Sequence, residues 1–114
     1  MMSIVAAVSQ GVPVVLQDAQ TSGDGVAIWA PPGATRHIVL LRANGGVTSG
    51  SIAVETAHDP NHSDGWATVV TSGVPVNNPG KEKRENFEGA FIALRARIVD
   101  PIVGGSVSVF YYGS

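Results

Sequence analysis

The clearest β-strand pattern in the chain is at residues 90–113, AFIALRARIVDPIVGGSVSVFYYG. Apolar side chains recur at every second position in both halves of it. The alternating positions are Ile92, Leu94, Ala96 and Ile98, then Val107, Val109 and Tyr111. Because successive side chains of a strand point to opposite faces, this period of two predicts two strands, each with one buried face. Residues 100–105, DPIVGG, interrupt the alternation, and we expect a hairpin turn there.

Further strands are expected on both sides of short turn signals. They are predicted at residues 12–18, 26–30, 36–42, 47–57 and 66–71. The run 36–42, RHIVLLR, is apolar at nearly every position, which is typical of a strand covered on both faces, and NGG at 44–46 predicts a tight turn after it. Residues 72–89 form the longest irregular span, and loops of this length usually contact a partner or carry function.

These elements predict an all-β fold without a useful amphipathic helix. The short strands and the turns between them favour an antiparallel β-sandwich or jelly roll of about seven or eight strands. We expect residues 1–11 to form an N-terminal arm or edge strand, and residues 12–114 to form a single domain of this kind.

The composition indicates a surface that other chains cover. Charged residues make up 14% of the chain, against roughly 25% in ordinary soluble domains. Hydrophobic residues reach 44%, and a domain this small has too much surface to hide them all. We therefore expect a homo-oligomer, a dimer or trimer, or contacts within a larger assembly. The alternative is a sandwich whose exposed small residues have no role.

Charge and hydropathy argue against several classes of partner. The net charge is −2, and the one cluster of basic residues, Lys81, Lys83 and Arg84, is interleaved with glutamates. Nucleic-acid binding needs a basic stripe, so none is expected. No run approaches the roughly 20 apolar residues that span a bilayer, and no membrane contact is expected. Cysteine is absent, which leaves the redox compartment open.

Residues 58–66, HDPNHSDGW, are the most suggestive loop. Asp59, Asn61 and Asp64 offer oxygen ligands, but the calcium-loop pattern fails because glycine comes one position late. Four-residue spacing would place His58 and His62 on one face only in a helix, and the proline between them argues against a helix. We expect an ordinary polar turn, and neither a metal nor another cofactor.

No arrangement of residues predicts catalysis. The chain lacks a G-x-S-x-G nucleophile elbow, and its glycine-rich pieces are not followed by a helix that would bind phosphate. Its paired carboxylates lie in loops without the apolar surroundings that raise a pKa. We expect no catalytic residues and no enzyme activity.

Arg95 and Arg97 stand side by side on one face of their strand. They either form a solvated face or make bidentate contacts with acidic residues of a neighbouring subunit. A second open question concerns the aromatic residues Trp29, Trp66, Tyr111 and Tyr112. They would form a sugar-stacking platform if the fold brought them together, although a tryptophan after a turn is more often a core residue.

About the last 60 residues resemble small β-sandwich proteins encoded among the structural genes of tailed bacteriophages. The shared features are IAVETAHDP followed by DGW, then FIALRARIVD and VGGSVSVFYYG. The matching positions are Glu55, Asp59, Pro60, Trp66, Arg95, Arg97, Ile98, Asp100, Gly104 and Gly105. Ala57 stands where that group usually has serine. A discoidin-like carbohydrate module also has an acidic turn before a strand that begins with tryptophan.

This resemblance implies a non-enzymatic virion protein, assembled in the cytoplasm of the bacterial host. Within that group, a capsid decoration (cement) protein that binds the major capsid protein and stabilises the shell fits best. The residues expected at partner contacts are Ile4, Val5, Val8, Lys81, Lys83, Arg84, Phe87, Arg95 and Arg97. The alternatives are a carbohydrate- or receptor-binding module that uses Asp59, Asn61, Asp64 and Trp66 as a ligand loop, or a tail or connector subunit.

Overall fold

The computed structural model describes residues 10–61, 65–74 and 82–114. Within these ranges the chain is all-β and forms one antiparallel sheet of six strands, close to the predicted number. The strands are β1 (Val14–Gln20), β2 (Ile28–Trp29), β3 (Arg36–Ala57), β4 (Ala67–Gly73), β5 (Glu82–Glu88) and β6 (Ala93–Gly113). The described residues contain no helix that is long and apolar enough to cross a membrane.

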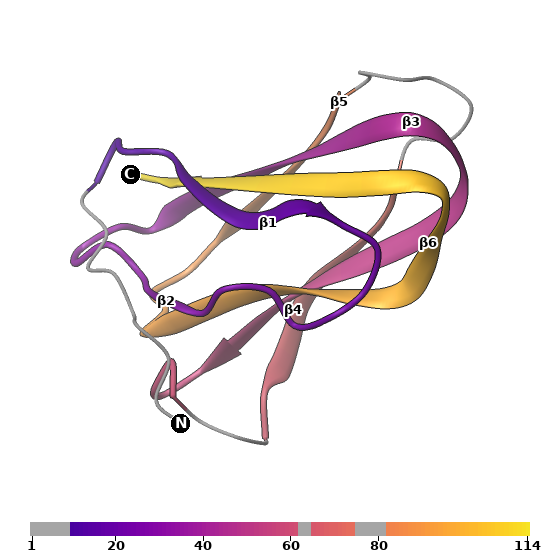
Figure 1. Cartoon of the computed structure of the whole chain (residues 1–114). Helices are drawn as coiled ribbons and strands as arrows, with labels where there is room; N and C mark the ends of the chain where they lie inside the picture. Colours follow the sequence, from indigo (N-terminus) through magenta and orange to yellow (C-terminus); the bar gives the residue numbers. More distant parts are fainter. Residues whose placement is uncertain (1–9, 62–64, 75–81) are drawn as a thin grey trace.

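Two long strands, β3 and β6, organise the sheet. They pair antiparallel along their whole length, from His37 opposite Gly113 to Ala57 opposite Ala93. Figure 1 shows that both strands bend together at one end, so that the sheet folds back on itself as two layers. The predicted hairpin at residues 100–105 and the predicted tight turn at 44–46 are therefore wrong, because each site is a bend within a continuous strand.

Glycine is needed at the bend because the two backbones approach closely there. Gly45 pairs with Gly105, and Gly45 and Gly104 have φ angles of 79° and 86°. A Cβ atom on Gly104 would meet the carbonyl oxygen of Gly46, and one on Gly105 would meet that of Asn44. Left-handed φ and close approach are both conditions that only glycine meets without strain. Gly45–Gly46 and Gly104–Gly105, which suggested chain reversals, therefore allow the paired strands β3 and β6 to bend sharply.

Each layer contains half of β3 and half of β6. The first layer holds β1, the C-terminal half of β6, the N-terminal half of β3 and β5. The second layer holds β2, the N-terminal half of β6, the C-terminal half of β3 and β4. The strand β5 lies inside the span 72–89 that was expected to be irregular. It pairs with β3 over seven residues, Glu82 to Glu88.

The core lies between the two layers and follows the predicted alternation. Leu94, Ala96 and Ile98 face it from the second layer, and Val107, Val109 and Tyr111 from the first. The other main contributors are Leu16, Ile28, Val39, Leu41, Ala43, Ile52 and Val54. Ile92, expected on the buried face, precedes β6 and is 56% exposed. The inward positions are even-numbered before the bend of β6 and odd-numbered after it, because register shifts at the bend change the phase.

Candidate functional site

The outer face of the first layer carries a row of apolar side chains across four strands. Phe110 on β6 pairs with Val15 on β1 and with Leu40 on β3, and Leu40 pairs with Arg84 on β5. Directly paired residues of antiparallel strands share a face, so these four side chains lie side by side. Leu40 and Phe110 are half-buried, whereas Val15 is 44% exposed. The row is therefore apolar, solvent-facing, and bordered by one cation.

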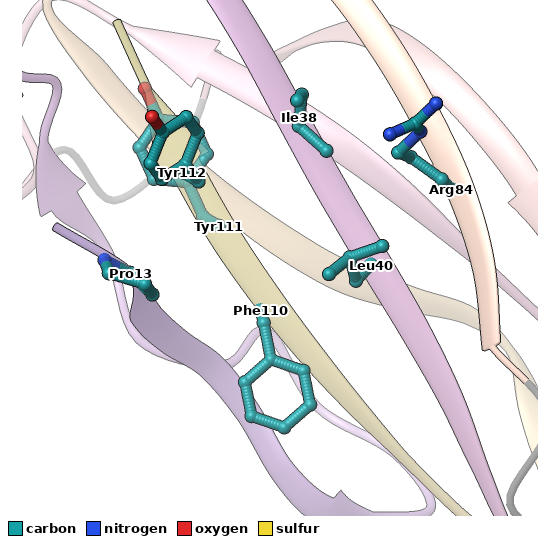
Figure 2. A pocket seen from close by; sticks show the side chains of 7 residues that line it. All are labelled: Pro13, Ile38, Leu40, Arg84, Phe110, Tyr111 and Tyr112. Carbon is teal, nitrogen blue, oxygen red and sulfur yellow. The ribbon is translucent and has the colours of Figure 1, made fainter. Parts of the chain in front are cut away.

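A second row runs beside the first, and a groove opens between them. Tyr112 on β6 pairs with Ile38 on β3, which pairs with Asn86 on β5. The groove has a volume of about 220 Å³. Figure 2 shows the residues around it: Pro13, Ile38, Leu40, Arg84, Phe110, Tyr111 and Tyr112. The Tyr111 hydroxyl is buried beside His37.

The lining of the groove is almost entirely apolar. Apart from the Arg84 guanidinium and the hydroxyls of Tyr111 and Tyr112, the side chains around it end in hydrocarbon. Such a lining binds apolar side chains, and an arginine at its border orients a neighbouring carboxylate.

Arg84 is the one residue of this groove among the predicted partner contacts, although the sequence contains a further signal for the groove. The run 36–42 is apolar at nearly every position, as expected for a strand covered on both faces. In the structure, the core covers Val39 and Leu41 on one face, while Ile38 and Leu40 face outward and stay partly exposed. The core therefore covers one face of this run, and the described part of the chain leaves the other face partly exposed.

Arg95 and Arg97 are held by a carboxylate of their own chain. Glu55 on β3 is 4% exposed, and its two oxygens accept hydrogen bonds from the Nε atoms of Arg95, at 2.8 Å, and Arg97, at 3.0 Å. Arg95 Nη1 also lies 3.5 Å from Asp24 Oδ2. Glu55 thus supplies the partner that a neighbouring subunit was expected to supply.

The four aromatic residues considered as a sugar platform lie in different places. Tyr111 is fully buried in the core, and Tyr112 is on the outer face of the first layer. Trp66 precedes β4, and the guanidinium carbon of Arg95 sits 4.4 Å from the centre of its ring. Trp29, 40% exposed, belongs to β2 in the second layer. The fold therefore does not assemble these residues into one platform.

The loop after β3 forms the expected polar turn in its described part. The backbone N–H of Asn61 donates to Asp59 Oδ1 at 2.9 Å, a local hydrogen bond typical of aspartate in turns. His62 and Asp64 lie outside the described residues. Within the described ranges, His, Cys, Asp and Glu side chains form no group of three that could hold a metal ion.

The remaining predicted contact residues have different surroundings. Ile4, Val5, Val8 and Lys81 lie outside the described residues. Lys83 Nζ lies 3.8 Å from Glu85 Oε2 in a solvent-exposed pair, and such pairs contribute little to stability. Phe87 is 9% exposed and stacks on His37, so it is a core residue and not the surface contact that was expected.

His37 is the centre of a buried polar network. It is 1% exposed, its Nε2 lies 2.8 Å from the carbonyl oxygen of Gly89, and its Nδ1 lies 2.6 Å from the Tyr111 hydroxyl. A carbonyl only accepts, so Nε2 carries a proton, and in a neutral imidazole Nδ1 then accepts from the hydroxyl. Burial raises the pKa of Tyr111 to about 12. Phe87 and Phe91 pack against the imidazole, and the network fixes the end of the sandwich.

This chain shares its fold with a prophage protein. The crystal structure of the SPBc2 prophage-derived protein YomS superposes with a TM-score of 0.61 at 14% sequence identity, and the match covers 98% of this chain and 100% of YomS. No protein-family model matches the sequence, and no curated protein matches it. At this identity the likeness to YomS concerns the fold, and it extends over both layers.

Proposed function

We propose that this chain is a non-enzymatic structural protein of a bacteriophage virion, and more specifically a capsid decoration protein. Two independent observations support the phage assignment. The motifs of residues 52–113 resemble tailed-phage structural proteins, and the fold is shared with a prophage-derived protein. The single observation that carries the binding role is the apolar groove on the outer face of the first layer.

The proposed partner is a segment of the major capsid protein that presents apolar side chains beside a carboxylate. Ile38, Leu40 and Phe110 are already half-buried, and full burial of such side chains yields about 1.5–3 kcal/mol each. Covering their exposed parts therefore contributes about 1 kcal/mol per residue. Arg84 would pair with the carboxylate and set the orientation. A tail or connector subunit would use the same groove on a different virion partner.

Cosedimentation with capsids that lack the protein tests this proposal. Wild-type chain is expected to bind the shells of its own phage, and cryo-electron microscopy should place the groove against the capsid protein. The variants Tyr112→Ala and Arg84→Glu are expected to weaken binding by roughly tenfold or more, about 1.4 kcal/mol. Val103→Ser, at an exposed residue near the bend, is the matched control and should bind as wild type.

Two results would contradict the proposal. One is a wild-type chain that binds no part of the virion. The other is binding that neither groove variant weakens. Binding to tails rather than to shells would support a structural role as a tail or connector subunit and would contradict capsid decoration. Glycan-array binding that Trp66→Ala abolishes without unfolding would instead favour the carbohydrate-binding alternative.

A further inference from the structure

In the described part of the chain, the strand β4 forms an edge of the sheet without a charged residue or a proline of its own. It pairs with β3 on one side, and no described strand pairs with it on the other, so one row of its backbone groups faces away from the described sheet. Its sequence, ATVVTSG, has neither a charged residue nor proline. An uncharged edge with free backbone donors and acceptors is a template for another strand.

The other edge strands in the described part of the chain are protected. Five of the seven residues of β5 are charged. Two register shifts interrupt β1, which also carries Asp18 and follows Pro13. The strand β2 is two residues long and is followed by two prolines. Charges, irregular register, prolines and short length are devices that keep edges from pairing. Of these devices β4 has one register shift, at Val69, and it lacks both charge and proline over its seven residues.

Self-pairing is geometrically compatible with β4 and not with β5. When two copies of one strand pair antiparallel about a two-fold axis, the residue on the axis faces its own copy. In β5, an axis at Lys83, Arg84 or Glu85 places like charges opposite each other, which is destabilising. In β4, an axis at Thr71 places threonine opposite threonine and Val70 opposite Ser72, with no charge involved.

The side chains of β4 support the same conclusion. Val69 and Val70 pack partly against the core and remain half-exposed. Thr71 pairs with Ala53, points to the outer face of the second layer and is exposed. The register shift of β4 falls at Val69, and the segment from Val70 to Gly73 pairs regularly with β3.

We propose that β4 pairs antiparallel with β4 of a second copy of this chain. The two four-stranded second layers would then join into one layer of eight strands. Backbone hydrogen bonds across the two-fold axis would supply the affinity, and the neighbouring strand would cover Val69 and Val70. This interface is separate from the groove, which lies on the first layer, and it does not depend on the virion role.

Sedimentation velocity over a range of concentrations tests the proposal. Wild-type chain is expected to be a dimer that dissociates on dilution. Thr71→Lys, which places a lysine against its own copy on the axis, should weaken the dimer by at least roughly tenfold, as should Thr68→Lys. Thr35→Lys adds the same charge at an exposed loop position and should leave the dimer intact. Circular dichroism should show native strand content in all three variants.

Hydrogen exchange gives a second readout, one that does not depend on the lysine variants folding. Amides of β4 that point away from β3 should be protected in the wild-type dimer and lose protection on dilution. The proposal is overturned if wild-type chain stays monomeric at its highest soluble concentration. It is also overturned if Tyr112→Ala, in the groove, dissociates the dimer while the two β4 variants do not.

Discussion

Replacing Tyr111 by phenylalanine isolates one buried hydrogen bond. The change keeps the ring in the core and removes the hydroxyl, which lies 2.6 Å from Nδ1 of His37. Tyr111 is fully buried and His37 is 1% exposed, so water does not replace the lost donor. The imidazole keeps its bond to the carbonyl of Gly89 and is left with an unpaired acceptor.

The expected cost follows from these contacts. Leaving a buried polar atom unpaired costs about 1–3 kcal/mol, and we take about 2 kcal/mol here. The entropy of unfolding for 114 residues is about 0.24 kcal/mol/K, from an average of about 2.1 cal/mol/K per residue. A loss of about 2 kcal/mol therefore lowers Tm by about 8 °C.

The neighbouring tyrosine provides a matched control. Tyr112→Phe removes the same atom from a side chain that is 37% exposed, so the free energy of unfolding should change by less than about 0.5 kcal/mol. Urea denaturation, followed by tryptophan fluorescence and by circular dichroism, measures both variants. If Tyr111→Phe destabilises the chain no more than Tyr112→Phe does, the buried network does not contribute as argued.

Three further predictions concern stability. Gly104→Ala should lower the free energy of unfolding by about 2–4 kcal/mol because it places a Cβ at positive φ against the carbonyl of Gly46, whereas Gly46→Ala, with open space around its Cβ, should change it by less than about 0.5 kcal/mol. Thermal melts compare the two variants, and equal losses would contradict the account of the bend. Glu55→Gln should lower the free energy of unfolding by about 1–3 kcal/mol because two partly buried guanidiniums lose their carboxylate. Glu82→Gln, at an exposed position of β5, is the control, and urea titrations measure both variants. Burial raises the pKa of Tyr111 from 10.0 to about 12, so between these pH values the folded chain retains a proton that the unfolded chain loses, and the free energy of unfolding should fall by about 2 kcal/mol from pH 10 to pH 12. Tyr111→Phe should lack this part of the decline, and parallel curves of unfolding free energy against pH for the two proteins would refute the assignment.

Local sequence could not distinguish a chain reversal from a bend. Gly45 and Gly104 have the positive φ that a tight turn would also require. Whether such a position reverses the chain or bends it depends on the strand that lies opposite, which is about 60 residues away in the sequence. The pairing of Gly45 with Gly105 decides this, and nothing within either glycine pair encodes it.

The strand β5 and the role of Glu55 were missed for a related reason. The sequence EKRENFE has no apolar alternation, and it becomes a strand because the edge of β3 offers it backbone partners. Glu55 meets Arg95 and Arg97 only because β3 and β6 pair in one particular register. A shift of one residue would move its carboxylate to the opposite face.

The local pattern of residues was enough to predict the all-β class and much of the core, because the alternation that places Leu94, Ile98, Val107 and Val109 inward is a property of neighbouring residues. It also indicated, in the run 36–42, that both faces of this strand are suited to being covered. Long-range pairing was needed to show that two glycine pairs bend a single ribbon, that Glu55 holds both arginines, and that the apolar groove and the uncharged edge of β4 lie on different layers. Each of these depends on which distant strands pair and in which register, and that is set by the energy of the whole packed sheet rather than by any local pattern.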